Sequence, residues 1–160
     1  MFRTDINYRK QRLIKLLYAI EKNQNEIAKA LNNDFKKTEF EAFLTETFIV
    51  ISELKLTIKN MKKWAKPNMV LPSILNFPSL DYIYKEPYGK VLIISPWNYP
   101  FQLAVSPAIA AIAAGNSVTI KPSELTPNTS KLIAKIFSEV FEKEHVEVIQ
   151  GGIEVSQELL

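Results

Sequence analysis

The stretch that decides the fold runs from Gly89 to Lys121 and reads GKVLIISPWNYPFQLAVSPAIAAIAAGNSVTIK. A short apolar run ends in the polar turn SPWN, a long apolar segment follows, and a second apolar run ends at Lys121. Continuous apolar runs of this length are typical of buried strands in parallel sheets. Pro100 suits the first turn of a helix, and Gly115 suits the position after its last turn. The stretch therefore predicts strand, turn, helix and strand.

The sequence that follows repeats this alternation. The Thr-Pro pair at 126–127 is typical of a helix start, and the apolar pattern predicts a helix to about Glu142. Residues 146–149 are predicted to form a third strand, and the glycines at 151–152 precede a further helix. Short loops between alternating strands and helices imply right-handed crossovers and a parallel sheet. We predict an α/β fold in which residues 89–160 form half of a doubly wound, Rossmann-like sheet.

Residues 1–66 are predicted to form a pair of amphipathic helices. In the first, apolar residues recur at helical spacing until the polar residues 32–34 end the pattern. Thr38 and Glu41 have the spacing of a capping box before the second helix, which we expect to end near Trp64. The residues expected to face inward are Leu13, Leu17, Ile20, Ile27 and Leu31 in the first helix, and Phe40, Leu44, Thr47, Ile51, Leu54, Ile58 and Met61 in the second.

Residues 67–88 hold four prolines, which indicates an extended linker with little helical structure. Within the linker, the sequence DYIYKEP alternates and places Tyr82 and Tyr84 on one face. We expect a short edge strand there, because proline is tolerated at the edge of a sheet.

Composition excludes several classes of function. The 160 residues are 47% hydrophobic and 23% charged with a net charge of +3, and no Lys/Arg block is longer than a pair. This disfavours nucleic acid as a partner. The chain has no cysteine, which excludes disulfides and a cysteine nucleophile within it, and its one histidine, His145, has no ligand set nearby, so we expect no metal site. With neither a secretory signal nor a membrane span, the expected location is cytoplasmic.

In doubly wound sheets, ligands bind beyond the carboxyl ends of the strands. In this sequence those ends are residues 95–98, 121–124 and 150–152. Asn98 offers two neutral N–H donors that do not titrate, which suits the stabilisation of a developing oxyanion. Asparagine is also common in turns, so an ordinary turn is the other interpretation.

Lys121 and Glu124 follow the second strand and suit the hydroxyls or phosphates of a nucleotide, or form a surface ion pair of little energetic value. Gly151 either allows a ligand to approach closely or makes a tight turn. The glycine-rich dinucleotide fingerprint G-x-G-x-x-G is absent from the sequence.

The segment EPYGKVLIISPWNYPFQLAVSPAIAAIAAGNSVTIKPSELTPNTSKL strongly resembles the coenzyme-binding region of the aldehyde dehydrogenase superfamily. The PWN-aromatic-P motif, the AAGN turn and the KPSE segment occur in the family's order and spacing. Two N-terminal amphipathic helices, DYIYKEPYG and VIQGG are most similar to the class 3, fatty-aldehyde branch. The resemblance covers essentially all 160 residues, and because family members are much longer, it implies an N-terminal portion of one.

The resemblance assigns a role to individual positions. Asn98 matches the asparagine whose amide stabilises the oxyanion of a thiohemiacetal. Lys121 and Glu124 match positions that bind the adenosine ribose of the coenzyme, and Gly151 matches a position near the adenine. Four residues match the lining of the coenzyme cleft: Ile94, Ser95, Pro96 and Trp97. The coenzyme implied is NAD or NADP, with NAD favoured because the Glu124 carboxylate repels a 2′-phosphate.

The family chemistry implied is oxidation of an aldehyde to a carboxylic acid through a cysteine thiohemiacetal, with hydride transfer to the nicotinamide. The nucleophile and the glutamate base are absent from these residues, so we expect the 160-residue chain to be inactive alone and the catalytic domain to lie elsewhere. The alternative is a non-catalytic nucleotide-binding or interaction fragment.

The expected partners are the nicotinamide coenzyme and an aldehyde substrate, with a homodimer for the full-length protein. The isolated half-sheet is expected to self-associate, because Ile120, Val148 and Leu159 lack their usual cover.

Overall fold

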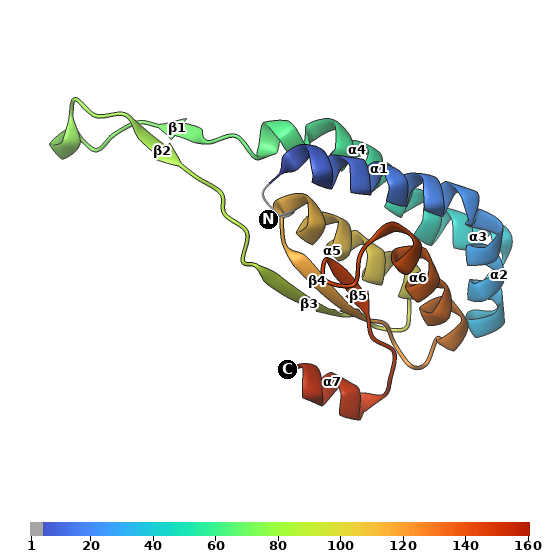
Figure 1. Ribbon diagram of the computed structural model, residues 1–160. Helices are drawn as coiled ribbons and strands as arrows, with labels where there is room; N and C mark the ends of the chain where they lie inside the picture. Colours follow the sequence, from blue (N-terminus) through green and yellow to red (C-terminus); the bar gives the residue numbers. More distant parts are fainter. Residues whose placement is uncertain (1–4) are drawn as a thin grey trace.

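The computed structural model describes residues 5–160 (Figure 1). Residues 1–4 of the predicted helical pair lie outside the described residues. The first part of the chain is helical and contains α1 (Ile6–Lys22), α2 (Gln24–Phe35), α3 (Glu39–Ala42), the π-helical turn η1 (Phe43–Thr47) and α4 (Phe48–Trp64). An extended arm follows, with β1 (Asn68–Val70), the short 3₁₀ turn η2 (Ile74–Asn76) and β2 (Asp81–Ile83). The last part contains β3 (Lys90–Ile94), α5 (Pro100–Ala114), β4 (Ser117–Lys121), α6 (Pro127–Val140), β5 (Val146–Val148) and α7 (Ile153–Leu159).

The strands β3, β4 and β5 form a parallel sheet in that order. Val91 pairs with Val118 across the first pair of strands, and Val118 pairs with Val146 across the second. In Figure 1, α5 and α6 cover one side of the sheet, α1 and α4 lie beyond them, and α7 lies on the other side of the strands. The predicted α/β fold, with helices followed by a parallel sheet, is confirmed.

The central strand of this sheet is β4, and its residues are almost all buried. Burial of β3 on both faces, which its apolar sequence predicted, is wrong: Ile93 is 8% exposed but Ile94 is 44% exposed. Within the described residues β3 lies at the sheet edge, and strand order depends on tertiary packing that hydropathy does not report. The expectation that Ile120 lacks cover is also wrong, because its side chain is fully buried.

The first predicted helix is divided differently from the prediction. Asn23 separates α1 from α2, and its side-chain Nδ2 donates to the Ala19 carbonyl at 2.8 Å. The polar residues 32–34 do not end the second piece, which continues to Phe35 and is followed by Lys36 in the left-handed conformation (φ 59°). A residue in that conformation commonly follows the last turn of a helix.

The second predicted helix begins as expected, because the Thr38 hydroxyl accepts from the Glu41 N–H at 3.2 Å. Its inward face is wrong at the start: Phe40 and Leu44 are 74% and 48% exposed. The π-helical turn η1 explains the difference. The extra residue in a π turn rotates the preceding helix relative to the following one, so Glu46 is buried instead.

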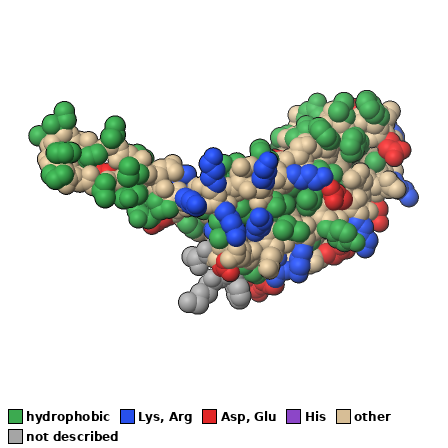
Figure 2. Space-filling model, turned by 90° about the horizontal axis from the view of Figure 1, so that it is seen from above, with side chains coloured by type: hydrophobic (Ala, Val, Ile, Leu, Met, Phe, Trp, Pro, Cys, Tyr) green, Lys and Arg blue, Asp and Glu red, His purple; other side chains and the backbone are tan. Residues whose placement is uncertain are grey.

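The linker forms a β-hairpin arm that extends away from the helices and the sheet (Figures 1 and 2). Tyr82 pairs with Met69 across the antiparallel strands, so the predicted strand has a partner strand, β1, that the sequence did not indicate. The rings of Tyr82 and Tyr84 lie 6.4 Å apart, which confirms that they share a face. The apolar side chains of the arm are exposed and include Leu71, Ile74, Leu75, Phe77 and Leu80. We call this surface the hairpin arm.

Candidate functional site

The carboxyl ends of the three parallel strands lie side by side. The Ser95 N–H donates to the Lys121 carbonyl at 3.1 Å, and the Ile149 N–H donates to the Ile120 carbonyl at 2.8 Å. The two segments that the sequence analysis selected are therefore neighbours at the carboxyl end of the sheet. They are residues 95–98 and 121–124.

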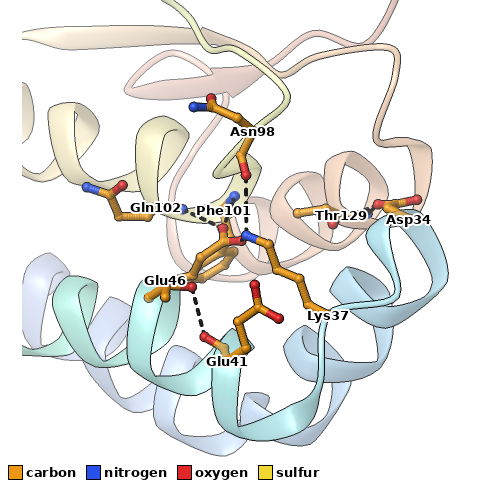
Figure 3. A network of polar contacts seen from close by, with 9 residues as sticks. Asp34, Lys37, Glu41, Glu46, Asn98, Phe101, Gln102 and Thr129 are labelled. Atoms are coloured by element: carbon orange, nitrogen blue, oxygen red, sulfur yellow. Dashed lines mark hydrogen bonds and ion pairs between the residues drawn. The ribbon is translucent and has the colours of Figure 1, made fainter.

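The loop after β3 carries Asn98 at the surface. Ser95 is buried and 5% exposed, and Pro96 and Trp97 are exposed. The Trp97 ring stacks on Phe35 at the end of α2, with ring centroids 5.8 Å apart. The side-chain amide of Asn98 points away from the helices, whereas its backbone carbonyl points toward Lys37 (Figure 3). Asn98 is exposed, so its side-chain amide is accessible to a ligand as a donor.

The segment after β4 holds an ion pair. Lys121 Nζ lies 2.6 Å from Glu124 Oε2; the lysine side chain is 3% exposed and the glutamate side chain 46% exposed. The hydrogen bond from Lys121 lowers the pKa of the Glu124 carboxyl, with a further contribution from the attraction of the ammonium charge. At the carboxyl end of the sheet, the buried ammonium of Lys121 offers a donor, and the Glu124 carboxylate offers an acceptor, to neighbouring hydroxyl groups.

This pair predicts a small pH dependence of stability. Because the folded state lowers the pKa of Glu124, the pair stabilises the fold above the ordinary carboxyl pKa, and this stabilisation is lost as the pH falls through the lowered value. Glu124 is half-exposed, so we expect about 0.2–1 kcal/mol in the free energy of unfolding. Urea unfolding of the wild type and of Glu124→Gln at a series of acid pH values measures this contribution. The difference in the free energy of unfolding between the two proteins should shrink as the pH falls. A constant difference would contradict the assignment.

Gly151 follows β5 and packs against α7. A Cβ added at this position would lie 2.4 Å from Val155 Cγ2 and 2.9 Å from Val155 Cβ. The close contact with α7 gives this glycine a packing role within the described residues. Its predicted proximity to the adenine stays a prediction.

Two acidic residues that the sequence did not single out hold the helices behind the site. Asp34, at the end of α2, accepts from the N–H of Thr129 at 2.7 Å and of Asn128 at 3.1 Å, in the first turn of α6. The predicted helix start, with Thr126 at the N-cap and Pro127 in the first turn, is confirmed. The Thr126 hydroxyl does not cap the helix, however, because it donates to the Ser123 carbonyl at 3.2 Å. No local pattern could have found Asp34, because it lies 95 residues before Thr129.

Glu46 accepts hydrogen bonds from the first turn of α5, as Asp34 does from the first turn of α6. Its Oε2 accepts from the N–H of Phe101 at 2.8 Å and of Gln102 at 3.2 Å, and its Oε1 lies 2.5 Å from Lys37 Nζ. Lys37 Nζ in turn donates to the Asn98 carbonyl at 3.3 Å. The Lys37 and Glu46 side chains are 8% and 0% exposed, so this is a buried ion pair directly behind Asn98. One sign of this buried glutamate was present in the sequence: Glu46 directly precedes Thr47, which was predicted to face inward.

Residues 5–160 contain neither a metal-binding cluster nor a membrane-spanning helix. No group of three His, Cys, Asp or Glu side chains in this range has an arrangement that holds a metal ion. No helix in the same range has the length and apolar character needed to cross a membrane.

Comparison with known proteins places the whole sequence in one family. The model of the aldehyde dehydrogenase family matches residues 1–160. The chain is 47% identical over 156 residues to 4,4'-diaponeurosporen-aldehyde dehydrogenase of Staphylococcus aureus, covering 98% of this chain and 34% of that protein. It is 44% identical over 153 residues to aldehyde dehydrogenase family 3 member I1 of Arabidopsis thaliana, covering 96% of this chain and 28% of that protein.

Solved structures agree with the sequence comparison. The substrate-bound structure of Staphylococcus aureus AldH superimposes with a TM-score of 0.95 at 47% identity, covering 98% of this chain and 34% of that one. The glyceraldehyde-3-phosphate dehydrogenase GapN of Methanocaldococcus jannaschii, complexed with NADP, superimposes with a TM-score of 0.83 at 25% identity, covering 96% of this chain and 34% of that one. The chain thus spans about a third of the length of these proteins. It belongs to the aldehyde dehydrogenase family and is similar to members of family 3.

Proposed function

We propose that this chain supplies the coenzyme-binding and oxyanion-stabilising part of an NAD(P)-dependent aldehyde dehydrogenase. The observation that carries the proposal is the adjacency of two strand ends: Asn98 follows β3, Lys121 and Glu124 follow β4, and the Ser95 N–H joins the ends by donating to the Lys121 carbonyl. In a chain of this family, these positions match the oxyanion and ribose sites. On this proposal, residues 89–160 are part of the coenzyme domain, and the helices of residues 1–66 and the arm of residues 67–88 support it.

The residues at the sheet edge fit a dinucleotide. Ser95 Oγ is buried and has no hydrogen-bond partner among residues 5–160. The apolar sides of Ile94 and Trp97 are about half exposed beside it. Lys121 donates to one hydroxyl of a ribose while Glu124 accepts from the other, as vicinal hydroxyls require. The bound coenzyme supplies the acceptor for a hydride.

The reaction proposed is the oxidation of an aldehyde and water to a carboxylic acid, with reduction of NAD(P)+. Attack of a thiolate on the aldehyde carbonyl places negative charge on its oxygen. The Asn98 amide donates to that oxygen and stabilises the charge as it develops. The 160 residues hold no cysteine, so the thiolate must come from residues outside this sequence.

Coenzyme binding by this chain provides the first test. A Trp64→Phe variant leaves Trp97 as the one tryptophan, and its fluorescence reports binding at the strand end. We expect NAD+ to quench it, with weaker binding of NADP+ because of the Glu124 carboxylate. Lys121→Met should weaken NAD+ binding by about 10-fold, the equivalent of one charge-assisted hydrogen bond.

Lys135→Met is the matched control, because Lys135 also pairs with a glutamate, Glu26, at 3.0 Å but lies on α6 away from the strand ends. It should leave the affinity for NAD+ unchanged. Equal affinities in the wild type and Lys121→Met would contradict the assignment of the ribose site.

We also propose that the 160-residue chain alone does not oxidise aldehydes. An assay with an aldehyde and NAD(P)+ should show no turnover, because no residue of the chain can form the thiohemiacetal. Clear turnover would contradict this. The alternative is a non-catalytic nucleotide-binding module, which requires that the full-length protein supplies no thiol at the site. In that case the full-length protein would bind the coenzyme but would not turn over an aldehyde.

The hairpin arm supports a proposal on assembly. Leu71, Ile74 and Leu75 are each more than 90% exposed, and contiguous exposed apolar side chains favour association. We propose that the chain self-associates and that the full-length protein is a homodimer in the cytoplasm. Light scattering should give a mass above that of the monomer, and a sharp monomer peak would count against association.

A further inference from the structure

We propose that Lys37 is a positioning residue that holds Asn98 in the orientation needed for oxyanion stabilisation; this rests on the function proposed above. Lys37 lies between α2 and α3, and its side chain is buried. Its Nζ donates to the Asn98 carbonyl at 3.3 Å and lies 4.3 Å from the centroid of the Tyr99 ring. The ammonium group therefore contacts the backbone of Asn98 and the side chain of the next residue.

The backbone of Lys37 is itself held in place. Lys36 ends α2 in the left-handed conformation, and Thr38 caps α3, so Lys37 lies between two defined helix ends. The Asn32 side chain donates to the Lys37 carbonyl at 2.9 Å. The lysine side chain therefore extends inward from a fixed point.

Glu46 fixes the other end of the contact. Its carboxylate binds Lys37 through Oε1 and binds the first turn of α5 through Oε2. The π-helical turn η1 directs Glu46 inward, and π turns are frequent at functional sites. The Glu46 carboxylate thus connects Lys37, which contacts the Asn98 carbonyl, with the first turn of α5.

The two residues contact Asn98 and the first turn of α5 through backbone atoms. Lys37 contacts the Asn98 carbonyl, Glu46 contacts the N–H groups of Phe101 and Gln102, and the Asn98 amide points the other way (Figure 3). Because the carbonyl and the side chain share one Cα, fixing the peptide plane also limits where the amide can point. Preorganised donors stabilise an oxyanion only when they are held within a fraction of an ångström.

A double-mutant cycle tests the inference in the full-length protein that carries these residues. The variant Lys37→Met/Glu46→Gln removes both charges together, and the glutamine oxygen still accepts from the first turn of α5. We expect it to lower the single-turnover rate of hydride transfer by between about 10-fold and 100-fold, as a misplaced catalytic group does. The Kd for the coenzyme should stay unchanged, because Lys121 and Glu124 are untouched.

In an Asn98→Ala background the same pair of substitutions should have little further effect, because the group it positions is gone. An equal loss of rate in both backgrounds, or no loss when Asn98 is present, would overturn the inference. Lys135→Met, which removes a surface ion pair, is the matched control and should leave the rate unchanged in both backgrounds.

An NMR measurement separates this inference from the proposed function. The ¹⁵N order parameter of the Asn98 side-chain amide should fall in Lys37→Met/Glu46→Gln and stay constant in Lys135→Met. If it falls while Asn98→Ala keeps the wild-type rate, Lys37 holds Asn98 but the oxyanion role is wrong. If it stays constant, the positioning role itself is wrong.

Discussion

Replacing Asn98 by alanine in the full-length protein is expected to lower the rate of hydride transfer by about 10²–10³-fold, the usual cost of losing one oxyanion donor. The Asn98 amide is exposed at the end of β3, and the main-chain contacts of the residue run to Lys37. The substitution therefore removes the donor and leaves the fold intact. Stopped-flow absorbance of the reduced coenzyme, with enzyme in excess over aldehyde, measures the rate of the chemical step.

Asn98→Asp is the informative companion, because aspartate has the same shape but an ionised carboxylate has no N–H to donate. It should be at least as damaging as alanine, whereas the Kd for the coenzyme should remain that of the wild type in both variants. A hydride-transfer rate close to the wild-type value in Asn98→Ala would show that the amide does not contact the reacting oxygen.

Replacing Glu46 by alanine is expected to have the largest effect on stability, about 3–5 kcal/mol in the free energy of unfolding. Two losses add together. The Lys37 ammonium remains buried without its partner, and the N–H groups of Phe101 and Gln102 lose their acceptor at the start of α5. Chemical denaturation of the 160-residue chain, followed by circular dichroism, measures the change.

Glu26→Ala is the matched control, because Glu26 forms an exposed ion pair with Lys135 and should change stability little. The double variant Lys37→Met/Glu46→Gln should recover much of the stability lost in Glu46→Ala, because no buried ammonium is left unpaired and the glutamine oxygen still accepts from the first turn of α5. If the single and double variants are equally unstable, the ion pair is not the source of the effect.

Local patterns predicted most of the secondary structure correctly. The continuous apolar runs around Ile93 and Ile120 are strands, and Pro100 and Gly115 bound the helix between them. These features depend on the residues within each segment: proline fixes its own φ, and Gly115 adopts a φ of 101° that side chains disfavour. The partner of β2 was missed, because a three-residue strand next to prolines has no periodic pattern to detect.

The segments that make up the candidate site were predicted from the sequence, whereas the residues packed behind them were not. The rule that ligands bind beyond strand ends selected Asn98, Lys121 and Glu124, and the structure brings their segments together through the contact of Ser95 with Lys121. The supporting residues Lys37 and Glu46 were not found. Glu46 lies 55 residues before Phe101, and a charged residue within an amphipathic helix is ordinarily expected on its exposed face.

The amino-acid sequence alone determined the order of strands and helices, the position of Asn98 after β3 and of Lys121 after β4, and the resemblance to the aldehyde dehydrogenases. Only the tertiary structure decided which strand lies at the sheet edge and which acidic residues accept hydrogen bonds from the first turns of α5 and α6. The physical reason is that hydropathy and capping patterns report on neighbours along the chain. The free N–H groups at the start of a helix donate to any carboxylate that packing brings to them, here Asp34 and Glu46 from the N-terminal helices.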